Sequence, residues 1–369
     1  MKKQTKINYI LTLILVFCIG ASIPVLTGSS QVTEQHSAKS EVPYCVTSPT
    51  VPAQVTFDGE TIDLRRYDRR ERMDREMMAF TYMHSTTMLL IKRANRYFPI
   101  IEPILKANGI PDDFKYLMVI ESNLNNIARS PAGAAGLWQF MPATGREFGL
   151  EVNDNVDERY HIEKATVAAC KYFKQAYAKY GDWMAVSAAY NAGQGRISSQ
   201  LDKQLASHAM DLWLVEETSR YMFRILAAKE IFNNPQRYGF LLKREHLYPP
   251  IPYKKVTVST SINDLNDYAK SQGITYAQLR DANPWLRDTS LRNKTGKTYT
   301  LYIPTQEGMY YDPKKTEAYN KQWVIDRKSS PLTSSHSGKR SLHCPFTAKQ
   351  PLSTRRCRRN VQIAFSMNC

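Results

Sequence analysis

Apolar residues recur at helical spacing from about Arg65 to Tyr238, and the apolar–polar alternation typical of a strand is scarce in that stretch. Proline and glycine residues interrupt this helical pattern, so the stretch cannot form one continuous helix. These interruptions predict several separate helices packed into one mainly α-helical domain over residues 65–240. We expect breaks at the following positions: Pro99, Gly109 to Pro111, Pro131, Pro142, Gly181, Gly193 and Pro235.

One of these predicted helices ends on an isolated carboxylate. Phe114, Leu117 and Met118 share a face at helical spacing, and Glu121 continues that face one turn later. A carboxyl at the edge of an apolar face loses hydration, which raises its pKa. A carboxyl that stays protonated near neutral pH is what a general acid requires. The alternative is a glutamate that reaches water or pairs with Arg129.

A small-residue turn and an aromatic block follow this helix. Gly133 and Gly136 carry no side chain, so another molecule can approach the backbone closely there. The block from Trp138 to Phe140 places an amide between two aromatic rings, an arrangement that often holds sugars. The alternative is a tight turn followed by core aromatics. Tyr190 likewise falls at the end of a predicted helix, before a second glycine-containing turn.

Three sequence blocks stand out within residues 75–238: Glu121-Ser122, Ser130 to Pro142 (SPAGAAGLWQFMP) and Ala189 to Gly193 (AYNAG). Together and in this order they resemble the soluble lytic transglycosylase (SLT) domain. The resemblance is closer to the membrane-bound lytic murein transglycosylase D branch. It implies a lysozyme-like, mainly helical fold and cleavage of peptidoglycan between N-acetylmuramic acid and N-acetylglucosamine.

When the residue roles of the family are assigned to the matching positions of this sequence, the resemblance implies that Glu121 is the catalytic acid and base. It implies that the substrate's own C6 hydroxyl attacks C1 and closes a 1,6-anhydro ring, so no second carboxylate is needed. A lysozyme-type muramidase that uses water, and a non-catalytic wall-binding protein, remain alternatives. Neither a cofactor nor a metal is expected, because the six cysteines lack metal-ligand spacing. The resemblance implies these sugar-binding residues: Ser130, Gln139, Met141, Tyr190, Asn191 and Glu217.

A second, smaller module is predicted over residues 253–306, after a proline-rich boundary. Its order of strand, helix, helix and strand resembles a LysM domain, an α+β module that binds N-acetylglucosamine-containing glycan. Thr260-Ser261 replaces the Gly-Asp that usually follows the first strand. The alternative is a structural βααβ appendage packed on the catalytic domain.

The two ends of the chain differ from the rest in composition. Lys2, Lys3 and Lys6 precede an apolar run from Ile10 to Ile19, which predicts a signal peptide or an anchor over residues 1–28. Residues 29–64 are predicted to be a linker. Residues 307–369 are predicted to be an extension with a basic, disordered tail, since nine Lys or Arg and no acid occur in residues 327–369.

Charge and export together limit the partners. The net charge is +16, and removing the nine tail charges leaves a mild excess that does not itself indicate nucleic acid. We therefore expect a monomeric exported protein of the periplasm or cell envelope that acts on peptidoglycan glycan strands. Membrane association through the N-terminus is a further expectation.

Overall fold

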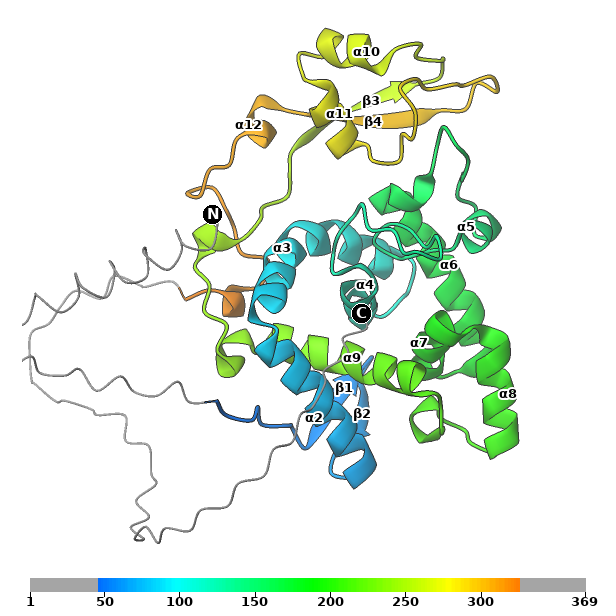
Figure 1. Cartoon of the computed structure of the whole chain (residues 1–369), viewed down its shortest axis with the longest axis vertical. Helices are drawn as coiled ribbons and strands as arrows, with labels where there is room; N and C mark the ends of the chain where they lie inside the picture. Colours follow the sequence, from blue (N-terminus) through cyan, green and yellow to red (C-terminus); the bar gives the residue numbers. More distant parts are fainter. Residues whose placement is uncertain (1–45, 326–369) are drawn as a thin grey trace, which may run out of the picture. The chain divides into compact units, whose positions relative to one another are not determined.

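Helices dominate the part of the chain that the computed structural model describes, residues 46–325 (Figure 1). Residues 46–50 contain no helix or strand and belong to a separate unit from the chain beyond Thr50. The mainly α fold class with a small α+β module is confirmed. The elements are β1 (Gln54–Phe57), β2 (Glu60–Asp63), α2 (Tyr67–Tyr82), α3 (His84–Ala107), α4 (Lys115–Ser122), α5 (Pro142–Glu147), α6 (Ile162–Tyr180), α7 (Trp183–Ala192), α8 (Gln194–Gln204), α9 (Glu216–Asn233), β3 (Tyr253–Val258), α10 (Leu265–Ser271), α11 (Tyr276–Ala282), β4 (Tyr299–Pro304) and α12 (Gln306–Met309).

Helix α4 is enclosed by its neighbours. Figure 1 shows it inside a ring formed by α3, α6, α7 and α9. Phe114, Leu117 and Met118 are each fully buried, as the helical spacing predicted. Tyr116 and Val119 are buried as well, so core residues surround the helix on more than one face. Packing on several sides therefore fixes where α4 ends.

Helix α9 is tied by ion pairs to two other parts of the fold. Its Arg220 pairs with the buried Glu76 of α2 at 2.6 Å. Its Lys229 pairs with Asp113, just before α4, at 2.7 Å. A buried charge is tolerated when it is paired in this way. The two ion pairs tie α9 to α2 and to the start of α4.

The predicted break at Pro99 is wrong. Helix α3 runs without interruption through Pro99 and Pro103. Phe98, Ile101 and Leu105 are all fully buried on this helix. Tertiary burial of its apolar face outweighs the lost backbone hydrogen bonds that make proline unfavourable in a helix.

The predicted linker over residues 29–64 is wrong for its last part. Strands β1 and β2 form an antiparallel hairpin in which Val55 pairs with Ile62. Both side chains are buried in the main core, and Phe57 lies edge-on to Phe114 with ring centroids 5.6 Å apart. The hairpin is thus an outer layer of the helical domain, and its alternating pattern is only four residues long on each strand, within a polar stretch of sequence.

The predicted βααβ module has the expected elements. β3 pairs antiparallel with β4, and α10 and α11 lie between them in sequence. Leu265, Leu279 and Leu301 form its core. Val156 and Tyr160 of the helical region belong to the same apolar cluster. The module therefore packs on the helical region through a shared core.

The predicted extension over residues 307–369 is more ordered at its start than expected. Trp323 is buried, and its Nε1 donates to the Phe232 carbonyl of α9 at 2.6 Å. The Tyr319 amide donates to Asn95 Oδ1 of α3 at 2.8 Å. These aromatic anchors fasten the segment before residue 326 to α3 and α9. The basic tail beyond it lies outside the described residues.

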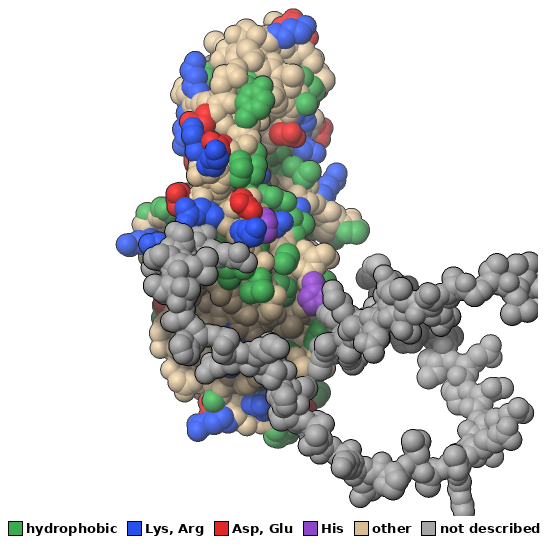
Figure 2. Space-filling model, turned by 90° about the vertical axis from the view of Figure 1, so that its left-hand side faces the viewer, with side chains coloured by type: hydrophobic (Ala, Val, Ile, Leu, Met, Phe, Trp, Pro, Cys, Tyr) green, Lys and Arg blue, Asp and Glu red, His purple; other side chains and the backbone are tan. Residues whose placement is uncertain are grey.

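The predicted signal or anchor over residues 1–28 also lies outside the described residues, as does the linker up to residue 45. Within residues 46–325, no helix combines the length and apolar character needed to cross a membrane. Figure 2 shows basic and acidic side chains intermixed on one face of the described part. That mixture agrees with the mild charge excess expected outside the tail.

Replacing Phe57 by alanine should destabilise the helical domain by about 3 kcal/mol, because it empties a buried aromatic site against Phe114. Chemical denaturation of the purified protein measures this loss. The matched control is Gln54→Ala on the exposed side of the same strand, which should change stability by less than about 0.5 kcal/mol. Equal, small effects of both substitutions would show that the hairpin does not belong to the folded core.

Candidate active site at the end of helix α4

Helix α4 ends immediately after Glu121 because the backbone reverses its handedness. Asn123 has φ 51° and Leu124 has φ 54°, both in the left-handed region. Asparagine tolerates this conformation, whereas a leucine there is strained and needs support from its surroundings. Leu124 is fully buried, and Arg93 donates to the Asn123 carbonyl at 2.9 Å. Packing therefore fixes the point at which the helix leaves Glu121.

The Glu121 carboxyl is half-buried and has one direct hydrogen-bond partner among residues 46–325. Tyr221 of α9 donates its phenolic hydrogen to Glu121 Oε1 at 2.5 Å. Burial raises the pKa of Glu121 to about 7, partly offset by this hydrogen bond and reinforced by the negative charge of Glu217. The group is therefore divided between acid and carboxylate near neutral pH, as the sequence argument expected. No ion pair with Arg129 is formed among the described residues.

Tyr190 and the Gln139 loop lie together near this carboxyl. Tyr190 Oη donates to the Trp138 carbonyl at 2.6 Å, directly before Gln139 in the chain. Burial raises the pKa of Tyr190, and the charge of Glu121 adds to the effect. Gln139 Nε2 donates to the Gly136 carbonyl at 2.7 Å, which leaves its amide oxygen as an acceptor. The structure thus brings Glu121, Tyr190 and the Gln139 loop into one neighbourhood.

The turn from Ser130 to Gly136 is held by the protein itself. Ser130 Oγ accepts the Ala134 amide at 3.0 Å and closes the turn. A side chain at Gly136 would come within 1.9 Å of the Arg159 carbonyl, so this glycine is required by a close approach within the chain. Gly133 has open space around it. The expectation that both glycines admit another molecule therefore fails for Gly136.

A buried ion pair holds the loop from Gly133 to Phe140 in place. Arg159 pairs with Asp157 at 2.7 Å and donates to the Gly133 and Phe140 carbonyls at 2.7 and 2.9 Å. Both charged residues are buried. The arginine satisfies two loop carbonyls on either side of Gln139. No sequence motif had singled out this pair.

The aromatic block does not offer faces to a ligand. Trp138 is fully buried, and its Nε1 donates to Thr166 Oγ1 at 3.0 Å. Phe140 is buried as well. The core alternative for these rings is therefore correct. Met141, which follows them, has 42% of its surface exposed.

The remaining predicted residues lie in different settings. Asn191 is half-buried next to Tyr190, at the end of α7. Glu217 is exposed in the first turn of α9, one turn before Tyr221. Its charge acts on Glu121, so the structure brings these two carboxylates into one electrostatic neighbourhood. Ser130 is half-buried in the turn described above.

Sequence reasoning missed Tyr221, which has the most direct contact with Glu121. A signal was present, because Tyr221 follows Glu217 by four residues and shares its helical face. The helical spacing of Glu217 and Tyr221 does not predict that α9 packs against the end of α4. That pairing depends on tertiary contacts a hundred residues apart in the chain.

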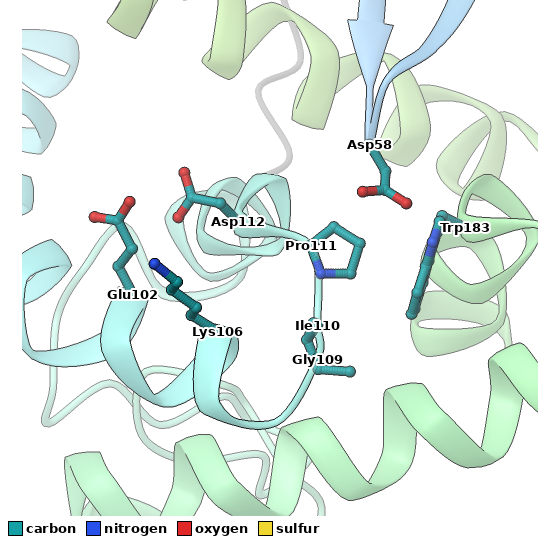
Figure 3. Close-up of a pocket in the computed structure, with 8 residues that line it drawn as sticks. All are labelled: Asp58, Glu102, Lys106, Gly109, Ile110, Pro111, Asp112 and Trp183. Atoms are coloured by element: carbon teal, nitrogen blue, oxygen red, sulfur yellow. The ribbon is translucent and has the colours of Figure 1, made fainter.

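Another hollow lies apart from the predicted site residues. It has a volume of about 370 Å³ between the β1–β2 turn, the end of α3 and the start of α7. Figure 3 shows Asp58 beside Trp183 on one side of Pro111, and Glu102 with Lys106 and Asp112 on the other. Asp112 pairs with Lys115. The hollow contains none of the residues expected to act in catalysis.

Two protein-family models match parts of the chain. Residues 98–211 match the Transglycosylase SLT domain, a range that includes Glu121, Gln139 and Tyr190. Residues 254–307 match the Soluble lytic transglycosylase C-terminal LysM-like domain. The chain therefore carries an SLT transglycosylase domain followed by a C-terminal LysM-like domain.

Several known proteins are similar to parts of the chain. Membrane-bound lytic murein transglycosylase D of Escherichia coli (strain K12) is 30% identical over 246 residues, which cover 63% of this chain and 51% of that protein. Peptidoglycan transglycosylase gp16 of Escherichia phage T7 is 31% identical over 135 residues, 35% of this chain and 10% of that protein. The chain spans about half the length of the transglycosylase D that it matches.

Among solved structures, the 70 kDa soluble lytic transglycosylase of Escherichia coli is similar to part of the chain. It shows 24% sequence identity and a TM-score of 0.33. The similar part covers 37% of this chain and 24% of that chain.

Glu121→Gln should stabilise the fold at alkaline pH relative to the wild type. Because the pKa of Glu121 is raised from 4.5 to about 7, the folded state holds a proton that the unfolded state loses between these values. Wild-type stability therefore falls as pH rises through that window, and glutamine removes the effect. Thermal melts at pH 4 and pH 8 should show a variant advantage only at pH 8.

The control for these melts is Glu147→Gln, an exposed carboxylate on α5. Its melting temperature should follow the wild type at both pH values. A Glu121→Gln advantage of the same size at pH 4 and pH 8 would contradict a raised pKa at Glu121.

Proposed function

We propose that this chain is a peptidoglycan lytic transglycosylase, with Glu121 as its only catalytic carboxyl. The observation that carries the proposal is a half-buried carboxyl with a pKa of about 7 at the end of α4, within the part that matches the SLT domain. Such a group donates a proton and takes one back at the same pH. The relatives named as murein and peptidoglycan transglycosylases support the same reaction class.

In the first step, protonated Glu121 donates its proton to the oxygen of the glycosidic bond between N-acetylmuramic acid and N-acetylglucosamine. The C1–O4 bond breaks, and C1 of the muramic acid becomes electron-poor. Near pH 7 about half of the Glu121 carboxyls carry the proton needed for this step. General acid catalysis of this kind contributes about 10²–10⁴-fold to the rate.

In the second step, the Glu121 carboxylate takes a proton from the muramic acid C6 hydroxyl. The hydroxyl oxygen bonds to C1 and closes the 1,6-anhydro ring, so no water is consumed and Glu121 regains its proton. The Tyr221 hydroxyl stabilises the carboxylate between the two steps, because it donates to Oε1. Intramolecular attack also benefits from a nucleophile that is already in position.

The setting of Glu217 favours this reaction over hydrolysis. A hydrolase needs a second carboxylate that activates water or attacks the sugar. Glu217, the carboxylate whose charge acts on Glu121, is exposed and makes no hydrogen bond to it among the described contacts. We infer that Glu217 orients substrate and that the lysozyme alternative lacks its second group.

The other predicted residues complete the proposal. The Gln139 amide oxygen and the exposed Met141 would contact the sugar chain, with Tyr190 as their support. Ser130 and Asn191 would flank them. The catalytic domain would span residues 65–240 together with the β1–β2 hairpin, and the LysM-like module residues 253–306. The enzyme would act as an exported monomer on glycan strands, without a cofactor.

Digestion of purified peptidoglycan should release 1,6-anhydromuramyl products without new reducing ends. Mass analysis separates the two reactions, because a hydrolysed end is heavier than an anhydro end by one water. Glu121→Gln should lower the cleavage rate at least about 10²-fold, since glutamine cannot deliver a proton. Reducing sugar that rises in step with glycan cleavage would establish the muramidase alternative instead.

Glu217→Gln is the matched comparison for that experiment. It removes the other carboxylate of the neighbourhood, and the anhydro product should persist. Loss of cleavage in a folded Glu217→Gln variant that persists at saturating peptidoglycan would show that a second carboxylate acts in the chemical step and would contradict the proposed reaction. Wild-type-like cleavage by a folded Glu121→Gln variant would contradict the catalytic role of Glu121, whereas absence of cleavage by the folded wild type would support the non-catalytic alternative.

A further inference from the structure

A cavity of about 550 Å³ lies between the helical domain and the LysM-like module. We call it the junction cavity. Its walls are α3, the segment from Asn125 to Ile127, the segment from Tyr160 to Glu163, strand β3 and the end of α11. This volume is typical of sites that take a small ligand, such as a sugar unit or a short piece of peptide.

The two walls of the junction cavity are fastened to each other. Lys297 of the module pairs with Glu151 at 2.5 Å, and Lys255 pairs with Glu163 at 3.1 Å. The Asp157 amide donates to the Trp285 carbonyl at 2.8 Å. Together with the shared apolar core, these contacts hold the cavity open at a fixed width.

Two residues that line the cavity each carry a buried polar atom with no hydrogen-bond partner within residues 46–325. The two atoms are Trp285 Nε1, from the module, and Asn126 Oδ1, from the helical domain. Trp285 has only 2% of its surface exposed. A buried polar group left unpaired is costly, so such atoms usually mark a place where another molecule completes the bonding.

The two atoms have opposite hydrogen-bonding character. The indole Nε1–H can only donate, and an amide oxygen can only accept. A secondary amide offers one carbonyl acceptor and one N–H donor, the two kinds of partner that these atoms lack. Rings next to the indole add an apolar surface, with His161 at 5.9 Å from Trp285 between ring centroids. Tyr253 and Tyr302 also line the cavity.

We propose that the junction cavity binds a secondary amide group of the cell-wall polymer through Trp285 and Asn126. This inference rests on the proposed function, which makes that polymer the substrate. The same chemistry occurs in the N-acetyl groups of the glycan and in the peptide bonds of the stem peptide. Asn126 follows Glu121 by only five residues, on the segment that leaves α4. A ligand in the cavity therefore contacts the segment that directly follows the helix of Glu121.

The test observes the Trp285 indole directly. The protein contains five tryptophans, so a ¹⁵N–¹H spectrum shows five indole signals, and Trp285→Phe assigns one by its disappearance. The full chain is titrated with N-acetylglucosamine trisaccharide, with a free stem tetrapeptide, and with the deacetylated glucosamine trisaccharide. A saturable shift of the Trp285 signal with either amide-containing ligand, and none with the deacetylated sugar, is the expected result. The ligand that produces it identifies the source of the amide.

Asn126→Ala should weaken the binding that the Trp285 signal reports by about tenfold, because it removes the acceptor of the pair. The matched control is Trp213→Phe, which removes an exposed indole and should leave this binding unchanged. No shift of the Trp285 signal with either amide ligand, or an equal shift with the deacetylated trisaccharide, would overturn the proposal.

The two proposals fail separately. Peptidoglycan cleavage by Trp285→Phe and the wild type is followed in parallel with the titrations. A Trp285 shift in a protein that cleaves nothing would contradict the proposed function and leave amide binding in place. Cleavage without any Trp285 shift would contradict the amide site alone.

Discussion

The hydrogen bond from Tyr221 to Glu121 is the interaction on which the rest of the site depends. It joins α9 to the end of α4 and sets the carboxyl at the edge of the core. Without the donor, burial alone would raise the pKa of Glu121 further and leave its carboxylate without a direct partner. The balance of the two effects produces a group that exchanges protons near neutral pH.

The surrounding fold holds Glu121 on α4 and Tyr221 on α9 in fixed positions. Glu76 and Asp113 pair with Arg220 and Lys229 on either side of Tyr221 along α9. The N-terminal hairpin covers Phe114 at the start of α4. On the other side of the site, Arg159 holds the carbonyls of the loop that carries Gln139. The site is therefore assembled from the ends of α4 and α7, the first turns of α9 and the loop that carries Gln139, and a buried ion pair holds that loop.

The sequence predicted local structure well and tertiary pairing poorly. The burial of Phe114 and the position of Glu121 at a helix end both follow from helical periodicity, a short-range property. Tyr221 and Arg159 were missed because their roles depend on partners distant in the chain. Pro99 and the hairpin were misjudged for a related reason. Proline predicts a helix break at Pro99, and the polar stretch predicts a linker where the hairpin lies. In both places burial against residues distant in the chain outweighs the local preference.

The central claim is that Glu121 titrates near neutral pH under the control of Tyr221. A ¹³C titration of glutamate side-chain carboxyls, with Glu121→Gln to assign the signal, measures this pKa directly. We predict a midpoint near pH 7 in the wild type and a higher midpoint in Tyr221→Phe, because the donor that favours the carboxylate is lost. Tyr238→Phe, which removes a similar tyrosine–glutamate bond to Glu230, should leave that midpoint unchanged. A wild-type midpoint near 4.5 would contradict the account.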